Sequence, residues 1–313
     1  MQTVEVHLLG THIIIHSDSP RLLSEVRRRF GLPDGYQSVS GPIELTVMQD
    51  ADQFRVLLKD REERLRLAER WPRFDDLIQL IIQRERSDLA FVHGSCVAAQ
   101  NKAALLFGSS TAGKTTLGLA LRQCGFHLLA EDTTPVSMEK GLVYPFLTGL
   151  NLREQTARLA DEQEWGDCNF IQVETSLLTN GVPLHWIIYV TPKTLSRTTC
   201  ISNVDMEEWE RFRRLTGAPP QAEAPTQERE VAIRTQADFA RAPELAPIRQ
   251  SQLARELLRH SHLPAKMGFP AALRAAMTLI THVQSARLVP GHLMQTVNLL
   301  LREWMLTRSS LPP

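Results

Sequence analysis

The spacing of apolar residues in the first third of the chain predicts a small α+β portion. Three segments carry strand signals: 4–9 alternates in part between apolar and polar residues, 11–15 is rich in β-branched residues, and 43–47 alternates. Ser19 followed by Pro20 predicts the start of a helix, because serine caps a helix and proline suits its first turn. Residues 57–88 are charged and carry apolar positions at helical spacing, so we expect helix there. We assign residues 1–88 to this portion, a candidate region for binding an acceptor.

The rest of the chain predicts an α/β fold. Two strand-like runs flank a polar turn at 100–102, which indicates a hairpin over 90–107. Further strands are expected at 126–130 and 184–190, and helices at 251–283 and 292–306. Residues 217–230 contain three prolines and no apolar period, so we expect a mobile loop. Together these patterns predict a mixed β-sheet core within residues 89–313, with helical C-terminal additions.

Residues 108–115 fit the nucleotide-binding pattern G-x-x-x-x-G-K-[ST]. An apolar run of strand length precedes them and a helical pattern follows. A strand, a Gly-rich turn and a helix in that order form a phosphate cradle, in which main-chain N–H groups and the helix N-terminus face the phosphates. Lys114 would reach the terminal phosphates, and the Thr115 hydroxyl would ligate Mg²⁺. The candidate nucleotide-binding residues are Gly108, Ser109, Ser110, Thr111, Ala112, Gly113, Lys114, Thr115 and Thr116.

Two neighbouring acids, Glu131 and Asp132, stand at the end of an apolar run, one helix after this loop. In an α/β sheet that position lies beside the phosphates, at the carboxyl ends of the strands. An enzyme that uses a nucleoside triphosphate needs a carboxylate for Mg²⁺ and a group that deprotonates the attacking oxygen. We expect Asp132 to bind Mg²⁺ and Glu131 to act as general base toward an acceptor hydroxyl. The alternative is an ordinary acidic junction between strand and loop.

Composition narrows the classes of function. The chain has 313 residues, 43% of them hydrophobic, and a formal net charge of zero. This balance predicts a packed core and gives no sign of a nucleic-acid or membrane partner. We see no signal peptide or membrane-length apolar run, and the four cysteines lack C-x-x-C spacing, so we expect a cytoplasmic protein with free thiols.

The histidines do not point to a metal hydrolase. They are scattered, without an H-x-x-x-H or H-x-H pair joined to an acid at metal-site spacing. The positions considered are His7, His12, His16, His93, His127 and His185.

From His93 to Asp132, the sequence resembles the catalytic core of the HPr kinase/phosphorylase superfamily. More closely, it resembles the HPr-kinase-related proteins found near peptide-modification genes, including lasso-peptide kinases. The shared pattern is His93-Gly94, the Gly-rich loop, Gly125 and the pair of acids, at the family's spacing. Residues 144–146 and 150–154 also resemble a family segment, so the likeness covers roughly residues 90–155.

This resemblance implies a core of the HPr kinase C-terminal-domain type that binds ATP and Mg²⁺ and phosphorylates a serine hydroxyl. It implies catalytic roles for Lys114, Asp132 and Glu131, and it adds His93 on the strand beside the loop. From the residues alone, a histidine on an apolar strand is more often a satisfied core residue, and the resemblance makes a role at the phosphates an equal alternative for His93. The chain departs from the family where Glu131 replaces the usual aspartate. Family members often assemble into oligomers, so a homo-oligomer is also an expectation.

Arg153 is a candidate contact to phosphate or acceptor, because a guanidinium can clamp phosphate oxygens with two hydrogen bonds. A surface ion pair with Glu154 is the alternative.

We therefore expect an ATP- and Mg²⁺-dependent kinase that transfers the γ-phosphoryl group to a serine of a peptide or protein. Two alternatives stay open. One is a kinase of a small hydroxy compound, such as a free amino acid. The other is a nucleotide-sensing or scaffolding protein without turnover.

Overall fold

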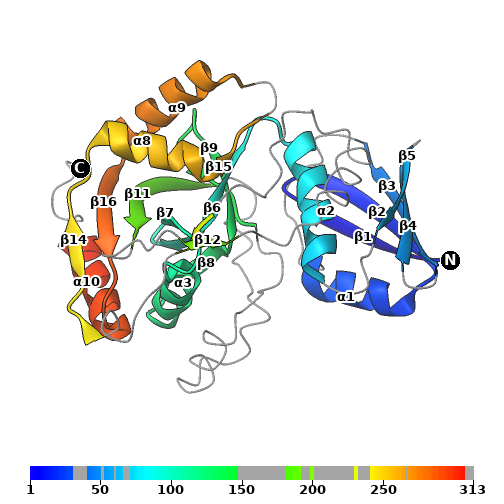
Figure 1. Cartoon of the computed structure of the whole chain (residues 1–313), viewed down its shortest axis with the longest axis horizontal. Helices are drawn as coiled ribbons and strands as arrows, with labels where there is room; N and C mark the ends of the chain where they lie inside the picture. The colour runs from blue at the N-terminus through cyan, green and yellow to red at the C-terminus, as the bar shows by residue number, and fades with distance from the viewer. Residues whose placement is uncertain are drawn as a thin grey trace.

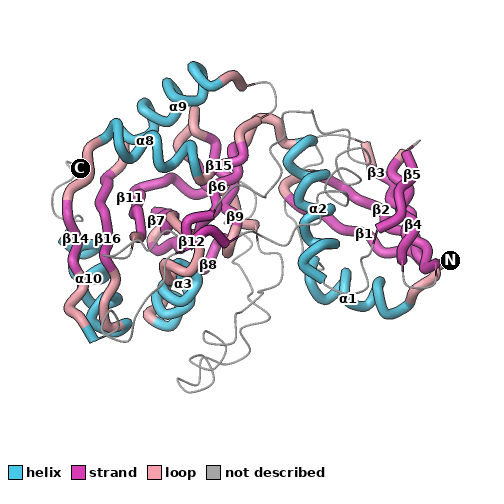
Figure 2. Tube along the Cα trace, in the orientation of Figure 1, coloured by secondary structure: helices cyan, strands magenta, loops and turns pink. Residues whose placement is uncertain are grey.

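The protein is a mixed α/β structure with two separate sheets (Figures 1 and 2). The computed structural model describes residues 1–30, 41–50, 53–59, 61–65, 71–146, 181–191, 198–200, 229–231, 240–264 and 267–306. Within these residues, a five-stranded sheet lies at one end of the molecule and a nine-stranded sheet at the other, and helix α2 (Trp71–Glu85) stands between them (Figure 1).

The N-terminal sheet follows the chain in strand order. Its strands are β1 (Gln2–Leu8), β2 (Thr11–Ser17), β3 (Ile43–Asp50), β4 (Gln53–Leu58) and β5 (Arg61–Leu65). Helix α1 (Pro20–Phe30) packs against β1 and β2, and alternate residues such as Val6 and Ile13 are buried on that face. The predicted helix start is confirmed, because the Leu22 N–H donates to Ser19 Oγ at 3.4 Å.

The helix expected from residue 57 onward begins later than predicted. Residues 53–58 and 61–65 form the strands β4 and β5 instead, and Phe54, Val56 and Leu58 alternate into the core. Strand β5 lies at the edge of the sheet. Charged side chains at an edge discourage pairing with another strand, which explains why β5 is charged. The apolar stripe itself is confirmed in α2, where Leu77, Ile78, Ile81 and Ile82 are buried.

The larger sheet has the strand order β10-β9-β6-β7-β11-β16-β14, and β8 and β15 also pair with β6. Three of its strands, β7, β11 and β16, run parallel. The strands are β6 (Ala90–Ala99), β7 (Lys102–Phe107), β8 (His127–Ala130), β9 (Thr133–Ser137), β10 (Leu142–Val143), β11 (Val182–Val190), β14 (Glu244–Ala246), β15 (Ser261–His262) and β16 (Gln284–Val289).

Helices cover both faces of this sheet (Figure 1). One face packs against α3 (Lys114–Gln123) and α10 (Leu293–Leu306). The other packs against α8 (Gln250–Arg259) and α9 (Phe269–Thr281). The strands between them are buried on both faces, so they lack the polar alternation of the N-terminal sheet. The strands β12 (Thr198–Cys200) and β13 (Arg229–Val231) form a separate two-stranded sheet.

Strand β6 pairs with both β7 and β9. Its first half pairs with β9, where His93 lies opposite Thr133, and its second half pairs with β7, where Gly94 lies opposite Phe107. A Cβ atom at position 94 would approach Leu106 O to 2.6 Å, so glycine allows the two strands to come together there. Strand β6 therefore brings the end of β7 and the start of β9 to the same place.

One buried arginine joins the N-terminal sheet to the core. Arg86, directly after α2, donates to Leu9 O in the turn between β1 and β2. It also forms two 2.8 Å hydrogen bonds to the Asp88 carboxylate and lies over the Tyr144 ring, 5.6 Å from its centre. The positive charge of Arg86 is thus compensated at the junction of three segments of the chain.

Other sequence predictions are confirmed. The hairpin over 90–107 forms, and Gln100 and Asn101 have the left-handed φ values, 54° and 57°, of a tight turn. The strand at 184–190 and the C-terminal helix also form. Residues 229 and 230, expected to belong to a mobile loop, are part of β13. Its other residues, 217–228, lie outside the described residues.

Cys96 and Cys124 are free thiols, as predicted; Cys168 lies outside the described residues. Among the helices of the described residues, none is both long and apolar enough to cross a membrane.

Candidate functional site

The Gly-rich loop lies between β7 and α3 and depends on its glycines. Gly108 has φ 143° and lies against Val190 O of the neighbouring strand, so any Cβ at this position would collide with that carbonyl. Gly113 has φ 96°, and Thr111 also takes a left-handed φ of 66°. Residues with a side chain rarely adopt such φ angles, so positions 108 and 113 favour glycine. The loop therefore turns sharply from strand into helix.

Helix α3 starts without a side-chain cap. Gly113 occupies the cap position, and no side chain bonds to the helix start. The first main-chain N–H groups of a helix have no partners within the helix and carry a partial positive charge. The start of α3 therefore presents a positive end toward the loop, which is the property that favours an anion.

The Lys114 side chain is folded into the same loop. It is buried, and its ammonium group donates to Gly108 O at 3.0 Å and to Ser109 O at 2.9 Å. A buried ammonium needs such acceptors because its charge loses contact with water. The loop thus holds a positive charge beside the start of α3.

The two neighbouring acids have different partners. The Thr115 hydroxyl donates to Glu131 Oε1 at 2.5 Å. Asp132 Oδ1 lies 3.2 Å from His93 Nδ1, and the Asp132 side chain is 69% exposed. The main chain explains the divergence: Asp132 has φ 61°, and the Thr133 N–H donates to Glu131 O across it. This bend of one residue turns adjacent side chains toward different neighbours.

The contacts of the two acids differ from the expected division of roles. We expected Thr115 and Asp132 on Mg²⁺ and Glu131 as base. The carboxylate that contacts the Thr115 hydroxyl belongs to Glu131, whereas Asp132 lies beside His93. The structure brings the loop, both acids and His93 together where β7 and β8 end and β9 begins. Arg153, the remaining candidate, lies outside the described residues.

Sequence reasoning missed one contact next to the acids. Gln79 of α2 donates through Nε2 to Thr133 Oγ1 at 2.5 Å, and Thr133 follows Asp132 directly. Thr134 then donates to Gly94 O at 2.9 Å. These bonds fix the start of β9 against α2 and β6, and therefore the position of Asp132. A glutamine within the apolar stripe of α2 was the signal that could have identified this contact.

A nearby thiol is not a nucleophile. Cys96 of β6 is fully buried, and burial raises the pKa of its thiol far above the ordinary range. Burial therefore keeps the Cys96 thiol protonated.

No protein-family model matches the sequence, and no curated protein matches it significantly. The chemistry of this site is therefore argued from its own contacts.

Proposed function

We propose that this protein is an ATP- and Mg²⁺-dependent kinase that transfers the γ-phosphoryl group to a hydroxyl, that of a serine in a peptide or protein. One observation carries the proposal. The Thr115 hydroxyl, in the first turn after the Gly-rich loop, bonds to Glu131 from the next strand, while the Lys114 ammonium lies in the same loop.

The residues of the loop suit a triphosphate. Gly108 and Gly113 adopt left-handed φ values that turn the loop sharply from strand into helix, and the uncapped start of α3 favours negative charge. The Lys114 ammonium is already directed at the loop and can exchange carbonyl partners for phosphate oxygens. A hydroxyl and a carboxylate oxygen are the hard ligands that Mg²⁺ prefers. Bound Mg²⁺ would neutralise charge on the phosphates.

The contacts support roles for Glu131 and Asp132 that are the reverse of those expected from the sequence. Glu131 lies at Thr115 and would hold Mg²⁺ with it. Asp132 is exposed, so an acceptor hydroxyl can reach its carboxylate, and His93 Nδ1 orients that carboxylate. Asp132 would accept the hydroxyl proton as the acceptor oxygen bonds to the γ-phosphorus and the bond to ADP breaks.

The test is transfer of radiolabelled γ-phosphate from ATP, with Mg²⁺, to a panel of serine peptides and free hydroxy amino acids. We expect transfer by the wild type and a loss of roughly 100-fold or more in Lys114→Ala, the scale of removing one charge-stabilising donor. Lys102→Ala is the matched control, because Lys102 lies at the opposite end of β7.

Three outcomes separate the alternatives. Transfer to peptides supports the proposal, and transfer to free amino acids alone indicates a small-molecule kinase. Tight ATP binding without transfer to any acceptor indicates a nucleotide sensor. Undiminished transfer by Lys114→Ala would contradict the proposed site.

A further inference from the structure

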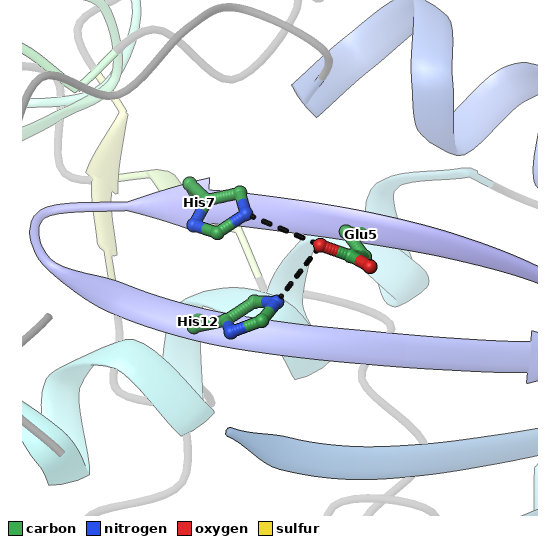
Figure 3. A group of neighbouring side chains, drawn as sticks. All are labelled: Glu5, His7 and His12. Atoms are coloured by element: carbon green, nitrogen blue, oxygen red, sulfur yellow. Dashed lines mark ion pairs between the residues drawn. The ribbon is translucent and has the colours of Figure 1, made fainter. Parts of the chain in front are cut away.

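We propose that Glu5, His7 and His12 form a binding site for a divalent transition-metal ion of the Zn²⁺ class, on the outer face of the N-terminal sheet. Figure 3 shows the two imidazole rings on neighbouring strands, each with one nitrogen close to the Glu5 carboxylate. This site is independent of the proposed kinase chemistry, because none of its residues belongs to the Gly-rich loop or the acid pair.

The hairpin register brings the three side chains together. His7 of β1 lies directly opposite His12 of β2, and Glu5 precedes His7 by two residues, so all three lie on one face. The other face carries the buried residues of β1 and β2. Leu9 and Gly10 form the connecting turn with φ values of 53° and 74°, the left-handed angles of a two-residue hairpin turn. That turn fixes the register and therefore the cluster.

The distances fit a metal ion. One nitrogen or oxygen atom of each residue lies within 4.8 Å of the other two. The Nε2 atoms of His12 and His7 lie 3.2 and 3.6 Å from the same oxygen, Glu5 Oε2. Nitrogen and oxygen ligands around tetrahedral zinc are separated by roughly 3.3 Å, given bonds of about 2.0–2.1 Å. The Glu5 side chain is 60% exposed and has room to move back as an ion enters between it and the rings.

One buried ring nitrogen of the cluster lacks a hydrogen bond. His12 Nε2 is buried and has no hydrogen-bond partner among the described residues, although Glu5 Oε2 is only 3.2 Å away. The two atoms are close, but their direction is not that of a hydrogen bond. The His7 and His12 rings stack with their centres 4.2 Å apart. A cation between the imidazole nitrogens and the carboxylate would satisfy a buried polar atom that the protein leaves unpaired.

The ligand set indicates the class of metal. Imidazole nitrogen suits Zn²⁺, Ni²⁺ and Cu²⁺, whereas Mg²⁺ and Ca²⁺ prefer oxygen alone. Two histidines and one carboxylate supply three ligands, which leaves a fourth tetrahedral position. His7 is 48% exposed, so this position is open to water or to a donor from another molecule.

The experiment uses full-length protein without a histidine tag and titrates it with Zn²⁺ in a calorimeter. Co²⁺ serves as a second probe, because a four-coordinate Co²⁺ ion absorbs visible light. We expect one Zn²⁺ per chain and a Co²⁺ absorption band. Loss of a residue that only orients a metal ligand already weakens affinity roughly 10–100-fold. His7→Ala and His12→Ala, which remove a ligand, are expected to weaken it at least as much.

The matched control is His16→Ala. His16 lies on the same face of β2 as His12, but its Nδ1 pairs with Thr3 Oγ1 at 3.0 Å instead of joining the cluster. Unchanged affinity in this variant supports the site. Equal weakening in His16→Ala and His12→Ala, or wild-type protein without stoichiometric Zn²⁺, would overturn the proposal and leave the cluster as an ion pair. If His12→Ala does not fold, the exposed Glu5→Gln variant decides, with at least a tenfold loss of Zn²⁺ affinity expected.

Discussion

Within the described residues, histidine is paired with carboxylate in two places, and the two pairs are built differently. His93 and Asp132 come from distant segments, a central strand and the bend after β8, and Glu131, next to Asp132, contacts the Thr115 hydroxyl. Glu5, His7 and His12 come from one hairpin, on the exposed face of a sheet that is buried on its other face. The first arrangement suits transfer of a proton beside an anion site, and the second suits a metal ion. The neighbours of a histidine–carboxylate pair therefore decide its chemistry.

The largest expected effect tests the pair formed by His93 and Asp132. Asp132→Asn is expected to lower kcat roughly 10²–10⁴-fold while ATP binding persists, because it removes the proton acceptor and leaves the loop intact. Glu131→Gln is expected to weaken the response of the rate to Mg²⁺ instead. Steady-state kinetics over a range of Mg²⁺ concentrations, with calorimetry for ATP, measure both. A normal rate in Asp132→Asn combined with a collapse in Glu131→Gln would restore the division of roles expected from the sequence.

The next effect concerns β6, the strand that carries His93. Gly94→Ala places a Cβ 2.6 Å from Leu106 O, between β6 and β7. Overpacking against main chain that cannot move aside is expected to destabilise the protein by about 3 kcal/mol. Gly41→Ala, beside the N-terminal sheet, is the control, because no atom lies within 4 Å of its added Cβ. Urea unfolding measures both variants, and equal stability would show that β6 can shift at no cost.

Arg86→Met sharpens the comparison at the junction of the two sheets. The variant loses the hydrogen bond to Leu9 O, a carbonyl of a buried residue, and both bonds to Asp88. An unsatisfied buried acceptor costs roughly 2 kcal/mol in the free energy of unfolding. Arg84→Met, at an exposed position two residues earlier in α2, is expected to change it far less. Equal losses in urea unfolding would mean that Arg86 contributes only as a surface charge.

The smallest effect depends on pH. The hydrogen bond from Arg86 lowers the pKa of the Asp88 carboxyl, and the arginine charge adds to this. A carboxyl whose pKa is lowered on folding stabilises the protein above its unfolded pKa of about 3.9, and this stabilisation is lost as the pH falls through the folded value. Asp88 is 59% exposed, so the effect is small. The stability difference between wild type and Arg86→Met should shrink from pH 6 to pH 3, and a constant difference would contradict this assignment.

Sequence patterns predicted the elements whose burial has a simple period. The strands β1 and β2 alternate, and the glycines and polar residues at 100–102 and 108–113 mark turns. The charged strand β5 was missed because its polar composition reflects its place at a sheet edge, which only the assembled sheet reveals.

The contacts between side chains were harder to predict. The acids could be located at a strand end, but their partners depend on the left-handed bend at Asp132. The pairing of His7 with His12 depends on the hairpin register, whereas sequence spacing alone leaves these histidines scattered.

Calorimetric titration of the wild type with a non-hydrolysable ATP analogue tests the central claim most directly. The account predicts binding at one site per chain that requires Mg²⁺, persists in Lys102→Ala and is lost in Lys114→Ala. Absence of binding by folded wild-type protein, with or without Mg²⁺, would contradict it.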